Sequence, residues 1–291
     1  MGSLFVPHLA FSDDGQQSDK FQYCLNTSTI SGCGEYSIVE YIEIASKAGY
    51  DAIEVWVGDL RDFLTKSGSL NQVKEVLDKS QLTVANAIGF APWLNENGGL
   101  EAMQNDMELL AKIGCQRIAA PPVGHEGNMP LDLFKTGRQY KKLLELGRET
   151  GVMPQLEFWG VSEIFNHLGQ AVMVTTVSGD TDARILPDVF HMFKGGTEFS
   201  ALEMLNPDLV DVFHLNDYML SIPREQQKDE DRVYPGDGDA PINMVIEFLN
   251  RSSKSKTLSV ELFNKEYWKL PAEEVAKTAL LKMQKIVQFN S

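Results

Sequence analysis

The stretch Pro154-Gln-Leu-Glu-Phe-Trp159 carries a single carboxylate, Glu157, inside an apolar run of strand length. Side chains alternate between the two faces of a β-strand, so Gln155, Glu157 and Trp159 share one face and the intervening residues share the other. The second face suits packing against helices, which directs Glu157 into the interior of the fold. A buried carboxylate is costly unless a metal ion or a partner compensates its charge. This run therefore predicts a buried strand that ends at a functional site.

Three later apolar runs each carry one more group of this kind. They are Ile185-Leu-Pro-Asp188, Val210-Asp-Val-Phe-His-Leu-Asn-Asp217 and Leu258-Ser-Val-Glu-Leu-Phe263, and their ligand-type residues are Asp188, His214 and Glu261. Taken singly, each has a plain structural explanation, such as a salt-bridged interior group or a cap at Asp188 for a helix that begins near Val189. Four such groups on four separate strands favour one shared site, because charge is rarely buried unpaired.

Strand-length apolar runs recur along the whole chain and alternate with helical patterns. The runs begin near Gln22, Ala52, Thr83, Arg117, Met153, Ala183, Val210 and Thr257. Seven of the eight intervals contain all or part of an i, i+3, i+4 apolar pattern, the spacing of an amphipathic helix. The alternation predicts an α/β fold, a single (β/α)8 TIM barrel over residues 21–291, with residues 1–20 as a flexible leader. The active site of such a barrel lies at the carboxyl ends of the strands.

The clearest helical patterns also have recognisable ends. They run over residues 38–48, 70–77, 100–113, 134–146 and 275–287. Gly49, Gly114 and Gly151 follow three of them, which predicts C-terminal caps in the left-handed conformation. A doubly wound sheet would usually show a glycine fingerprint after its first strand, and no GxGxxG follows the strand predicted near Gln22. The closed barrel is therefore the favoured architecture.

Composition and charge restrict the partners of the protein. The 291 residues are 43% hydrophobic and 23% charged, which is typical of a globular domain. A formal net charge of −15 opposes binding to nucleic acid and anionic membranes, and no apolar run approaches the length of a membrane span. Three widely spaced cysteines predict neither a disulfide framework nor a zinc knuckle. We expect a cytoplasmic protein; export is the alternative, if residues 4–11 are the remnant of a trimmed signal.

The ligand types indicate which metal the site would prefer. Three carboxylates and one imidazole, without sulfur, form a hard and oxygen-rich set. Such a set favours one divalent ion, Mn²⁺, Mg²⁺ or Co²⁺, and is also compatible with Zn²⁺. We therefore predict a single divalent cation at the mouth of the barrel.

With these ligands the chain resembles the xylose isomerase-like TIM-barrel sugar isomerases and epimerases, a family that also includes inosose dehydratases. The resemblance covers the barrel from about Gln22 to the C-terminus, and its closest motif match is to ketose 3-epimerases. In that subgroup the metal is held by Glu, Asp, His and Glu from the fifth to the eighth strand. This implies metal-binding roles for Glu157, Asp188, His214 and Glu261.

The resemblance also implies substrate contacts. In ketose 3-epimerases a second Glu lies six residues after the first ligand, as Glu163 does here, and a His lies three residues after the Asp ligand, as His191 does. An Arg before a Pro-Gly-x-Gly segment is matched by Arg232, and an aromatic residue two positions past the last Glu is matched by Phe263. The loop after the seventh strand, residues 219–241, is longer here than in compact epimerases.

Two further residues are candidate substrate contacts on weaker grounds. Trp56, with Trp93 and Trp159, lies near a strand end, where these rings would form an apolar wall against a sugar face; packing in the barrel core explains each equally well. His125 lies on a loop after the fourth strand, where it would contact substrate or stand in solvent.

Together these groups predict an enzyme that works through an enediolate. A divalent ion that bridges a carbonyl and a neighbouring hydroxyl acidifies the carbon-bound proton, and Glu157 and Glu261 would abstract and return that proton. We expect a metal-dependent sugar isomerase or epimerase acting on a keto-sugar or polyol. The alternative is a lyase or dehydratase on the same scaffold, acting on an inosose or a 3-keto-glycoside.

Two other classes of protein fit the sequence less well. A DNA-repair nuclease like endonuclease IV would need ligands for three zinc ions and a basic groove, against five histidines and a charge of −15. A non-catalytic binding protein would leave the four ligands without explanation. The predicted partner is a small sugar or polyol, with no nucleic acid and no membrane, and self-association into a homo-oligomer is left open.

Overall fold

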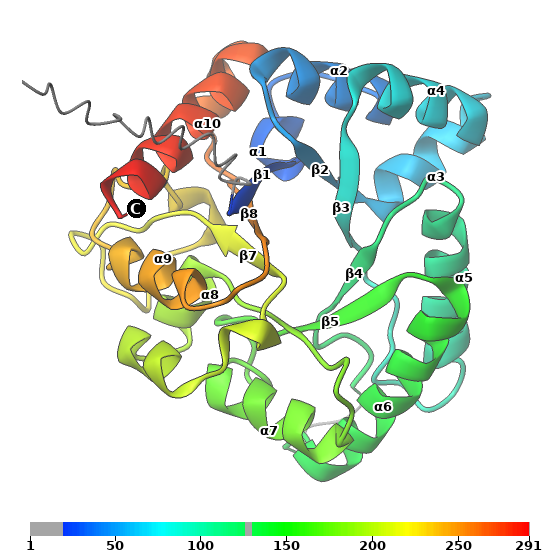
Figure 1. The fold of residues 1–291 in the computed structure, drawn as a ribbon, viewed down its shortest axis with the longest axis vertical. Helices are drawn as coiled ribbons and strands as arrows, with labels where there is room; N and C mark the ends of the chain where they lie inside the picture. Colours follow the sequence, from blue (N-terminus) through cyan, green and yellow to red (C-terminus); the bar gives the residue numbers. More distant parts are fainter. Residues whose placement is uncertain (1–19, 126–129, 291) are drawn as a thin grey trace, which may run out of the picture.

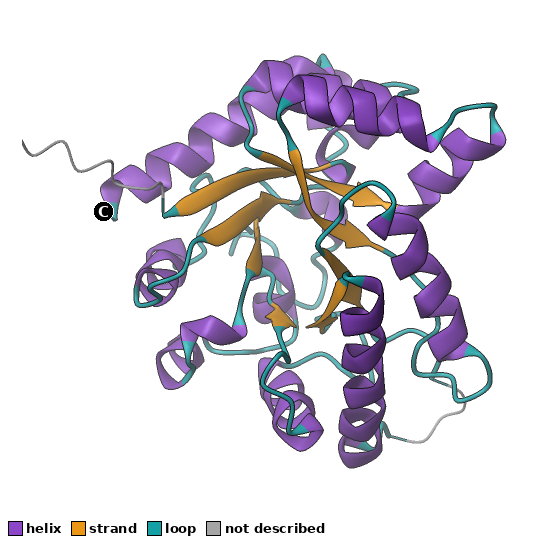
Figure 2. Cartoon of the chain, turned by 45° about the vertical axis from the view of Figure 1, so that its right-hand side comes forward, coloured by secondary structure: helices purple, strands orange, loops and turns teal. Residues whose placement is uncertain are grey.

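The structure is a computed structural model that describes residues 20–125 and 130–290, in which a ring of parallel strands is surrounded by helices (Figure 1; Figure 2). The strands are β1 (Phe21–Asn26), β2 (Ala52–Trp56), β3 (Thr83–Ile88), β4 (Arg117–Ala120), β5 (Met153–Glu157), β6 (Ile185–Leu186), β7 (Val212–Leu215) and β8 (Lys256–Val260). They pair in two groups, in the orders β3-β2-β1-β8-β7 and β4-β5-β6. Every pairing is parallel.

Two seams close these groups into a barrel. The Gln116 amide donates a hydrogen bond to the Val84 carbonyl at 3.3 Å, which joins β3 to β4. The His214 amide donates to the Pro187 carbonyl at 2.9 Å, and Asp188 and His214 form a parallel bridge, which joins the end of β6 to β7. The predicted (β/α)8 barrel is confirmed, and its second seam runs through two of the predicted metal ligands.

The helices cover the outside of this ring. They are α1 (Ser28–Ser31), α2 (Ile38–Ala48), α3 (Val57–Thr65), α4 (Leu70–Ser80), α5 (Gly99–Ala111), α6 (Leu133–Thr150), α7 (Leu168–Ser178), α8 (Val189–Lys194), α9 (Ile242–Asn250) and α10 (Ala272–Phe289). Short 3-10 turns span Phe199–Met204, Pro207–Leu209, Asp229–Asp231 and Tyr267–Lys269. Within the described residues, none of the helices has the length and apolar character that crossing a membrane requires.

The helix ends follow the glycine pattern, with one difference. Gly49 and Gly151 close α2 and α6 at φ values of 97° and 80°, the left-handed caps predicted from the sequence. Gly114 also has a positive φ, 74°, but α5 already ends at its cap, Lys112. The predicted leader lies almost entirely in residues 1–19, outside the described residues.

The two faces of the strands have different chemistry, and this positions the site. Leu156 and Phe158 are fully buried between the strands and the helices. The barrel interior instead holds fully buried polar groups, among them Glu54, Asn86, Gln155, His214 and Ser259. Polar groups inside a barrel must bond to one another, because water does not reach them. The network that results leads directly to the carboxyl ends of the strands.

The long loop after β7 is held in shape by one buried carboxylate, Asp217. Its Oδ1 accepts the backbone N–H groups of Tyr218 and Ala240, both at 2.8 Å, and its Oδ2 accepts those of Gly236 and Gly238 at 2.9 and 3.0 Å. A β-carbon on Gly238 would lie only 2.4 Å from Asp217 Oδ1, so the loop approaches this carboxylate as closely as a glycine allows. Residues 218–240 therefore form a defined structure.

We expect Asp217→Asn to destabilise the protein by about 2 kcal/mol or more, because the amide N–H₂ would face two backbone donors that then lose their acceptor. Urea unfolding monitored by circular dichroism measures the difference. Asp239→Asn is the matched control: this exposed carboxylate of the same loop accepts a single backbone N–H, that of Leu220. Equal stability losses in the two variants would contradict the role assigned to Asp217.

Candidate metal centre and its pocket

Three buried side chains converge at the carboxyl ends of neighbouring strands. Asp188 follows β6, His214 lies on β7 and Glu261 follows β8, and one ligand atom from each lies within 4.8 Å of the other two. His214 Nδ1 is 3.4 Å from Glu261 Oε2 and 3.7 Å from Asp188 Oδ2. Two carboxylate oxygens and one imidazole nitrogen at this separation could hold a divalent ion after small side-chain movements.

Asp188 combines the two roles that its sequence position suggested. Its Oδ1 accepts the His191 amide at 2.8 Å and caps the N-terminus of α8. Its Oδ2 faces the interior, where Asn216 Nδ2 donates to it at 2.9 Å. The cap fixes the carboxylate, so the structural and the metal-binding explanations are compatible.

His214 presents one unused nitrogen to this group. Its Nε2 lies 3.0 Å from Glu54 Oε1. Its Nδ1 is buried and has no hydrogen-bond partner among the described residues. A buried polar atom without a partner needs an explanation, and a bound cation supplies one. Coulomb attraction from Glu54 and Glu261 outweighs burial and raises the pKa of His214 well above its usual value, so the site attracts positive charge.

Arg232 compensates the two carboxylates of the group. Its Nη1 donates to Glu261 Oε2 at 2.8 Å and to Asp188 Oδ2 at 3.0 Å, and the side chain is almost fully buried. The guanidinium packs between the rings of Phe190 and Phe263, at 4.7 and 5.1 Å from their centroids. An arginine held in this way has one orientation, so its charge is directed at the site.

His191 is fixed as a neutral ring beside Arg232. Its Nε2 lies 3.3 Å from Arg232 Nη2, and because a guanidinium only donates, this nitrogen accepts and Nδ1 carries the proton. Burial lowers the pKa of His191, against the attraction of Asp188, and the Arg232 charge lowers it further. The Nδ1–H is buried and has no hydrogen-bond partner within the described residues.

Glu157 lies at the same pocket but outside the three-residue group. It is 4% exposed. Burial raises its pKa to about 8; Glu261 and Asp188 add to this, and His214 opposes it. Within the described part of the chain, no hydrogen bond holds the carboxyl group. A buried carboxyl with a pKa near neutrality can take up and release a proton, as a general acid or base must.

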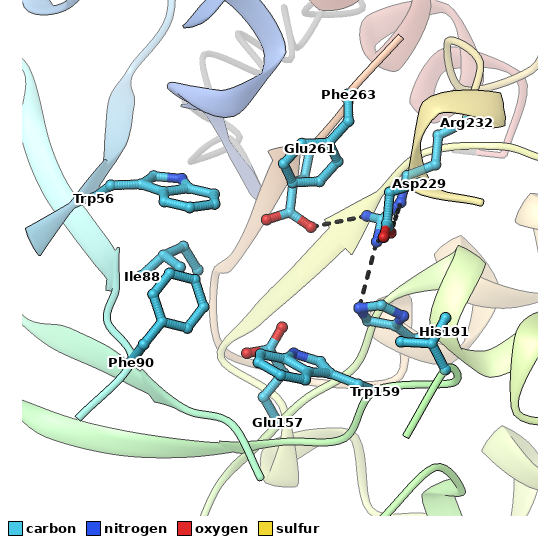
Figure 3. A pocket seen from close by; sticks show the side chains of 11 residues that line it. Trp56, Ile88, Phe90, Glu157, Trp159, His191, Asp229, Arg232, Glu261 and Phe263 are labelled. Carbon is cyan, nitrogen blue, oxygen red and sulfur yellow. Dashed lines mark hydrogen bonds and ion pairs between the residues drawn. The ribbon is translucent and has the colours of Figure 1, made fainter. Parts of the chain in front are cut away.

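A pocket of about 290 Å³ opens beside these groups, and its lining is both polar and aromatic (Figure 3). The polar lining residues are Glu157, His191, Asp229, Arg232 and Glu261, and the apolar ones are Trp56, Ile88, Phe90, Trp159, Val161 and Phe263. The rings of Trp56 and Phe90 meet at 5.4 Å between centroids, and those of Phe90 and Trp159 at 6.1 Å. A ligand here would place one face against aromatic rings and direct its polar groups to the polar lining residues.

The comparisons with known proteins agree with this geometry. A family model described as "Xylose isomerase-like TIM barrel" matches residues 42–286. The chain belongs to this family. An inosose isomerase of Halalkalibacterium halodurans is 28% identical over 251 residues, which cover 84% of this chain and 89% of the relative. Inosose isomerase is also the name of a Bacillus subtilis relative that is 29% identical over 82% of this chain and 88% of its own length.

Solved structures show how widely the fold is shared in the family. The crystal structure of an IolI protein with a bound zinc atom superposes with a TM-score of 0.83 at 24% identity, covering 93% of this chain and 99% of that protein. A D-psicose 3-epimerase of Clostridium cellulolyticum H10, solved with D-tagatose, superposes with a TM-score of 0.72 at 14% identity, covering 91% and 99%. At these identities the likeness shows the fold.

Most of the predicted site residues of this family member lie together. Asp188, His214 and Glu261 form the donor group. The pocket is lined by the predicted Trp56, Glu157, His191, Arg232, Glu261 and Phe263. Of the other tryptophans considered, Trp159 lines the pocket, whereas Trp93 is buried in the core and donates to the Pro121 carbonyl.

Two predicted substrate contacts do not lie at the pocket. The segment between Trp159 and Phe165 folds back on itself, with the Trp159 amide donating to the Phe165 carbonyl at 3.1 Å, and Glu163 is exposed on this turn. His125 lines a separate depression beside Glu96 and Lys135. The placement gives no support to substrate contact by Glu163 or His125, which stays a prediction.

Three residues of the site were missed from the sequence. Glu54 is a lone charge within the apolar strand Ala52-Ile-Glu-Val-Trp56, which is the same signal that identified Glu157. Asp229 lines the pocket and accepts Arg232 Nε at 3.1 Å. Phe90 lines it from an irregular segment after β3. Neither of the last two has a periodic pattern around it that would have revealed its position.

We expect the protein to bind one divalent ion and His214→Gln to weaken that binding by more than about 100-fold, since removal of a ligand should exceed the 10–100-fold typical of its outer partners. Isothermal titration of chelator-treated protein with Zn²⁺ and Mn²⁺ measures this. His167→Gln, at the N-terminus of α7 and outside the pocket, is the matched control and should bind as the wild type does. Wild-type binding by His214→Gln would remove His214 from the ligand set.

The raised pKa of Glu157 predicts a pH-dependent stability of the metal-free protein. The folded state holds this proton up to about pH 8, whereas the unfolded chain releases it near pH 4.5. The stabilisation by this group is therefore complete below pH 4.5 and is lost progressively as the pH rises from 4.5 to about 8. Relative to wild type, Glu157→Gln should become more stable across this window, by an amount on the order of a few kcal/mol. Urea unfolding in EDTA at pH 5, 6.5 and 8 tests this, and a constant difference would contradict it.

Proposed function

We propose that this protein is a divalent-metal-dependent isomerase or epimerase of a polyhydroxylated ketone, and that its substrate is a cyclic polyol ketone of the inosose type. The observation that carries the proposal is a three-donor metal group beside a pocket that one of its members, Glu261, lines together with a second buried carboxyl, Glu157, and with His191 and Arg232. The names of its curated relatives, inosose isomerases, support the substrate class.

The chain's own residues would hold the ion and the substrate. Asp188, His214 and Glu261 would bind the metal, with Glu157 as a fourth ligand on the facing side of the pocket. A bound divalent ion would polarise a carbonyl oxygen and stabilise the negative charge that develops on it. Arg232 would place its positive charge beside the substrate oxygens, and His191 would line the same part of the pocket, so together they would restrict the position of the ring.

Proton transfer falls to the two glutamates, which are held differently. Asn26 Nδ2 donates to Glu261 Oε1 at 3.0 Å and Arg232 Nη1 donates to Oε2 at 2.8 Å, so both oxygens are engaged. Glu157 has its pKa near 8 and no such restraint within the described residues. We assign to Glu157 the abstraction of the carbon-bound proton next to the carbonyl, which gives an enediolate; Glu261 occupies the facing position, from which a proton would return only in an epimerisation.

The shape of the pocket supports a neutral ring as substrate. The apolar C–H face of a ring would lie on Trp56, Phe90 and Trp159, and its hydroxyl groups would reach the polar lining residues. Asp229 adds a further carboxylate to that lining, where it can accept from a hydroxyl group. Repulsion from Glu157, Glu261 and Asp229 disfavours a phosphorylated substrate.

A substrate panel followed by NMR in deuterated water tests the proposal. The panel contains inososes, free ketoses and 3-keto-glycosides, each with metal-loaded enzyme. We expect deuterium to enter the carbon next to the carbonyl of an inosose, with formation of an isomer. Release of water or of a glycosyl group would instead indicate the lyase or dehydratase chemistry, and absence of exchange in every substrate would reject the enediolate mechanism.

Glu157→Gln should lower the rate of deuterium exchange by about 10²–10⁴-fold, because an amide cannot take up the proton. Glu145→Gln, an exposed position on α6, is the matched control and should exchange at the wild-type rate. Circular dichroism and metal titration on the same samples separate loss of chemistry from loss of fold or ion. Wild-type exchange by Glu157→Gln would remove Glu157 from the reaction.

A further inference from the structure

Glu54 is a fully buried carboxylate in the middle of β2 that the proposed reaction does not use. Its carboxylate lies inside the barrel and contacts His214 of β7, although β1 and β8 lie between β2 and β7 in the sheet. We propose that Glu54 is a positioning residue: by accepting a hydrogen bond from Nε2 of His214, it leaves Nδ1 of that ring free to bind the metal. This inference rests on the metal centre of the proposed function.

The hydrogen bond decides which nitrogen of His214 is available. A carboxylate only accepts, so the 3.0 Å contact with Glu54 Oε1 requires the proton on Nε2. The other nitrogen, Nδ1, then faces Glu261 Oε2 at 3.4 Å and Asp188 Oδ2 at 3.7 Å. It is buried and has no hydrogen-bond partner in the described residues. The ring is thus oriented with its ligand nitrogen toward the two carboxylates.

Glu54 is itself held so that it cannot serve as a ligand. Its Oε1 also accepts Asn86 Nδ2 at 2.5 Å, and its Oε2 accepts Asn26 Nδ2 at 2.9 Å and Ser259 Oγ at 2.5 Å. Each oxygen therefore has two donors, which fixes the plane of the carboxylate. Burial opposes the ionisation of Glu54, but its contacts with His214, Ser259 and Asn86 keep its pKa below the usual value.

The same network connects Glu54 to the pocket through one amide. Asn26 donates to Glu54 Oε2 at 2.9 Å and to Glu261 Oε1 at 3.0 Å, and its Oδ1 accepts Trp56 Nε1 at 3.0 Å. Asn26 therefore orients three groups: the Glu54 carboxylate behind His214, the proposed metal ligand Glu261, and the Trp56 ring in the pocket wall. A negative charge behind a ligating imidazole also makes its free nitrogen a stronger base, which strengthens the bond to a cation.

Glu54→Gln tests the inference through metal affinity. In either orientation the amide N–H₂ faces the donor of Asn86 or of Asn26, and the negative charge behind His214 is lost. We expect the affinity for Zn²⁺ to fall about 10–100-fold, measured by isothermal titration of chelator-treated full-length protein. Ser259→Ala is the matched control: it removes one donor to Oε2, leaves the His214 contact intact, and should change the affinity by less than about fivefold.

Nitrogen NMR of the Zn²⁺-loaded wild type gives a readout that does not depend on the folding of any variant. We expect a slowly exchanging proton on His214 Nε2 and a metal-bound Nδ1. Ligation through Nε2, or wild-type Zn²⁺ affinity in folded Glu54→Gln, would overturn the role of Glu54 and leave the proposed function standing. A wild-type protein that binds no divalent ion would overturn both.

Discussion

The burial of negative charge inside the barrel is the constraint on which the rest of the structure depends. Glu54, Glu157, Asp188 and Glu261 all lie below 5% exposure around one histidine. Taking carboxylates out of water costs several kcal/mol for each ion unless opposite charge and hydrogen bonds replace the solvent. The observed partners do this in part, through Arg232 and the amide side chains of the barrel interior. The buried Nδ1 of His214, 3.4 Å from Glu261 Oε2, lies where the proposed divalent ion would add one more positive charge.

This requirement gives the loop after β7 a structural role. The strand ends supply the carboxylates, and the cation Arg232 comes from this loop, residues 218–240. Asp217 holds that loop through four backbone N–H groups, and Lys194 Nζ donates to the carbonyls of Arg224, Glu225 and Gln227. A loop restrained at both ends can hold a guanidinium in a buried site, where a mobile loop would expose the charge to water instead.

The part of the fold that could be predicted is the part governed by local periodicity. Strand and helix patterns located the barrel, and lone charges in apolar strands located Glu157, Asp188, His214 and Glu261, because a strand has only two faces and one of them is interior. Glu54 is a lone charge in an apolar strand of the same kind, but the four-ligand pattern of the resemblance has no position for it. The positions of Asp229 and Phe90 depend on irregular segments whose path is set by distant contacts, which no local pattern encodes. For the same reason a spacing of six residues did not bring Glu163 to the pocket.

The unequal restraint of the two glutamates bears on the fate of an enediolate in this pocket. Both carboxylate oxygens of Glu261 accept hydrogen bonds, one from Asn26 and one from Arg232. Protonation of Glu261 would break one of these bonds and remove the negative charge that pairs with Arg232. Glu157 is buried, its pKa is about 8, and proton exchange there breaks no such bond in the described residues. Glu157 is therefore the more mobile proton carrier of the two. When one residue both removes and returns the proton, transfer stays on one face of the substrate and moves hydrogen between neighbouring carbons, which is isomerisation. Inversion at a single carbon would require Glu261 to give up one of its partners, so the proposed roles of the two glutamates predict isomerisation and not epimerisation.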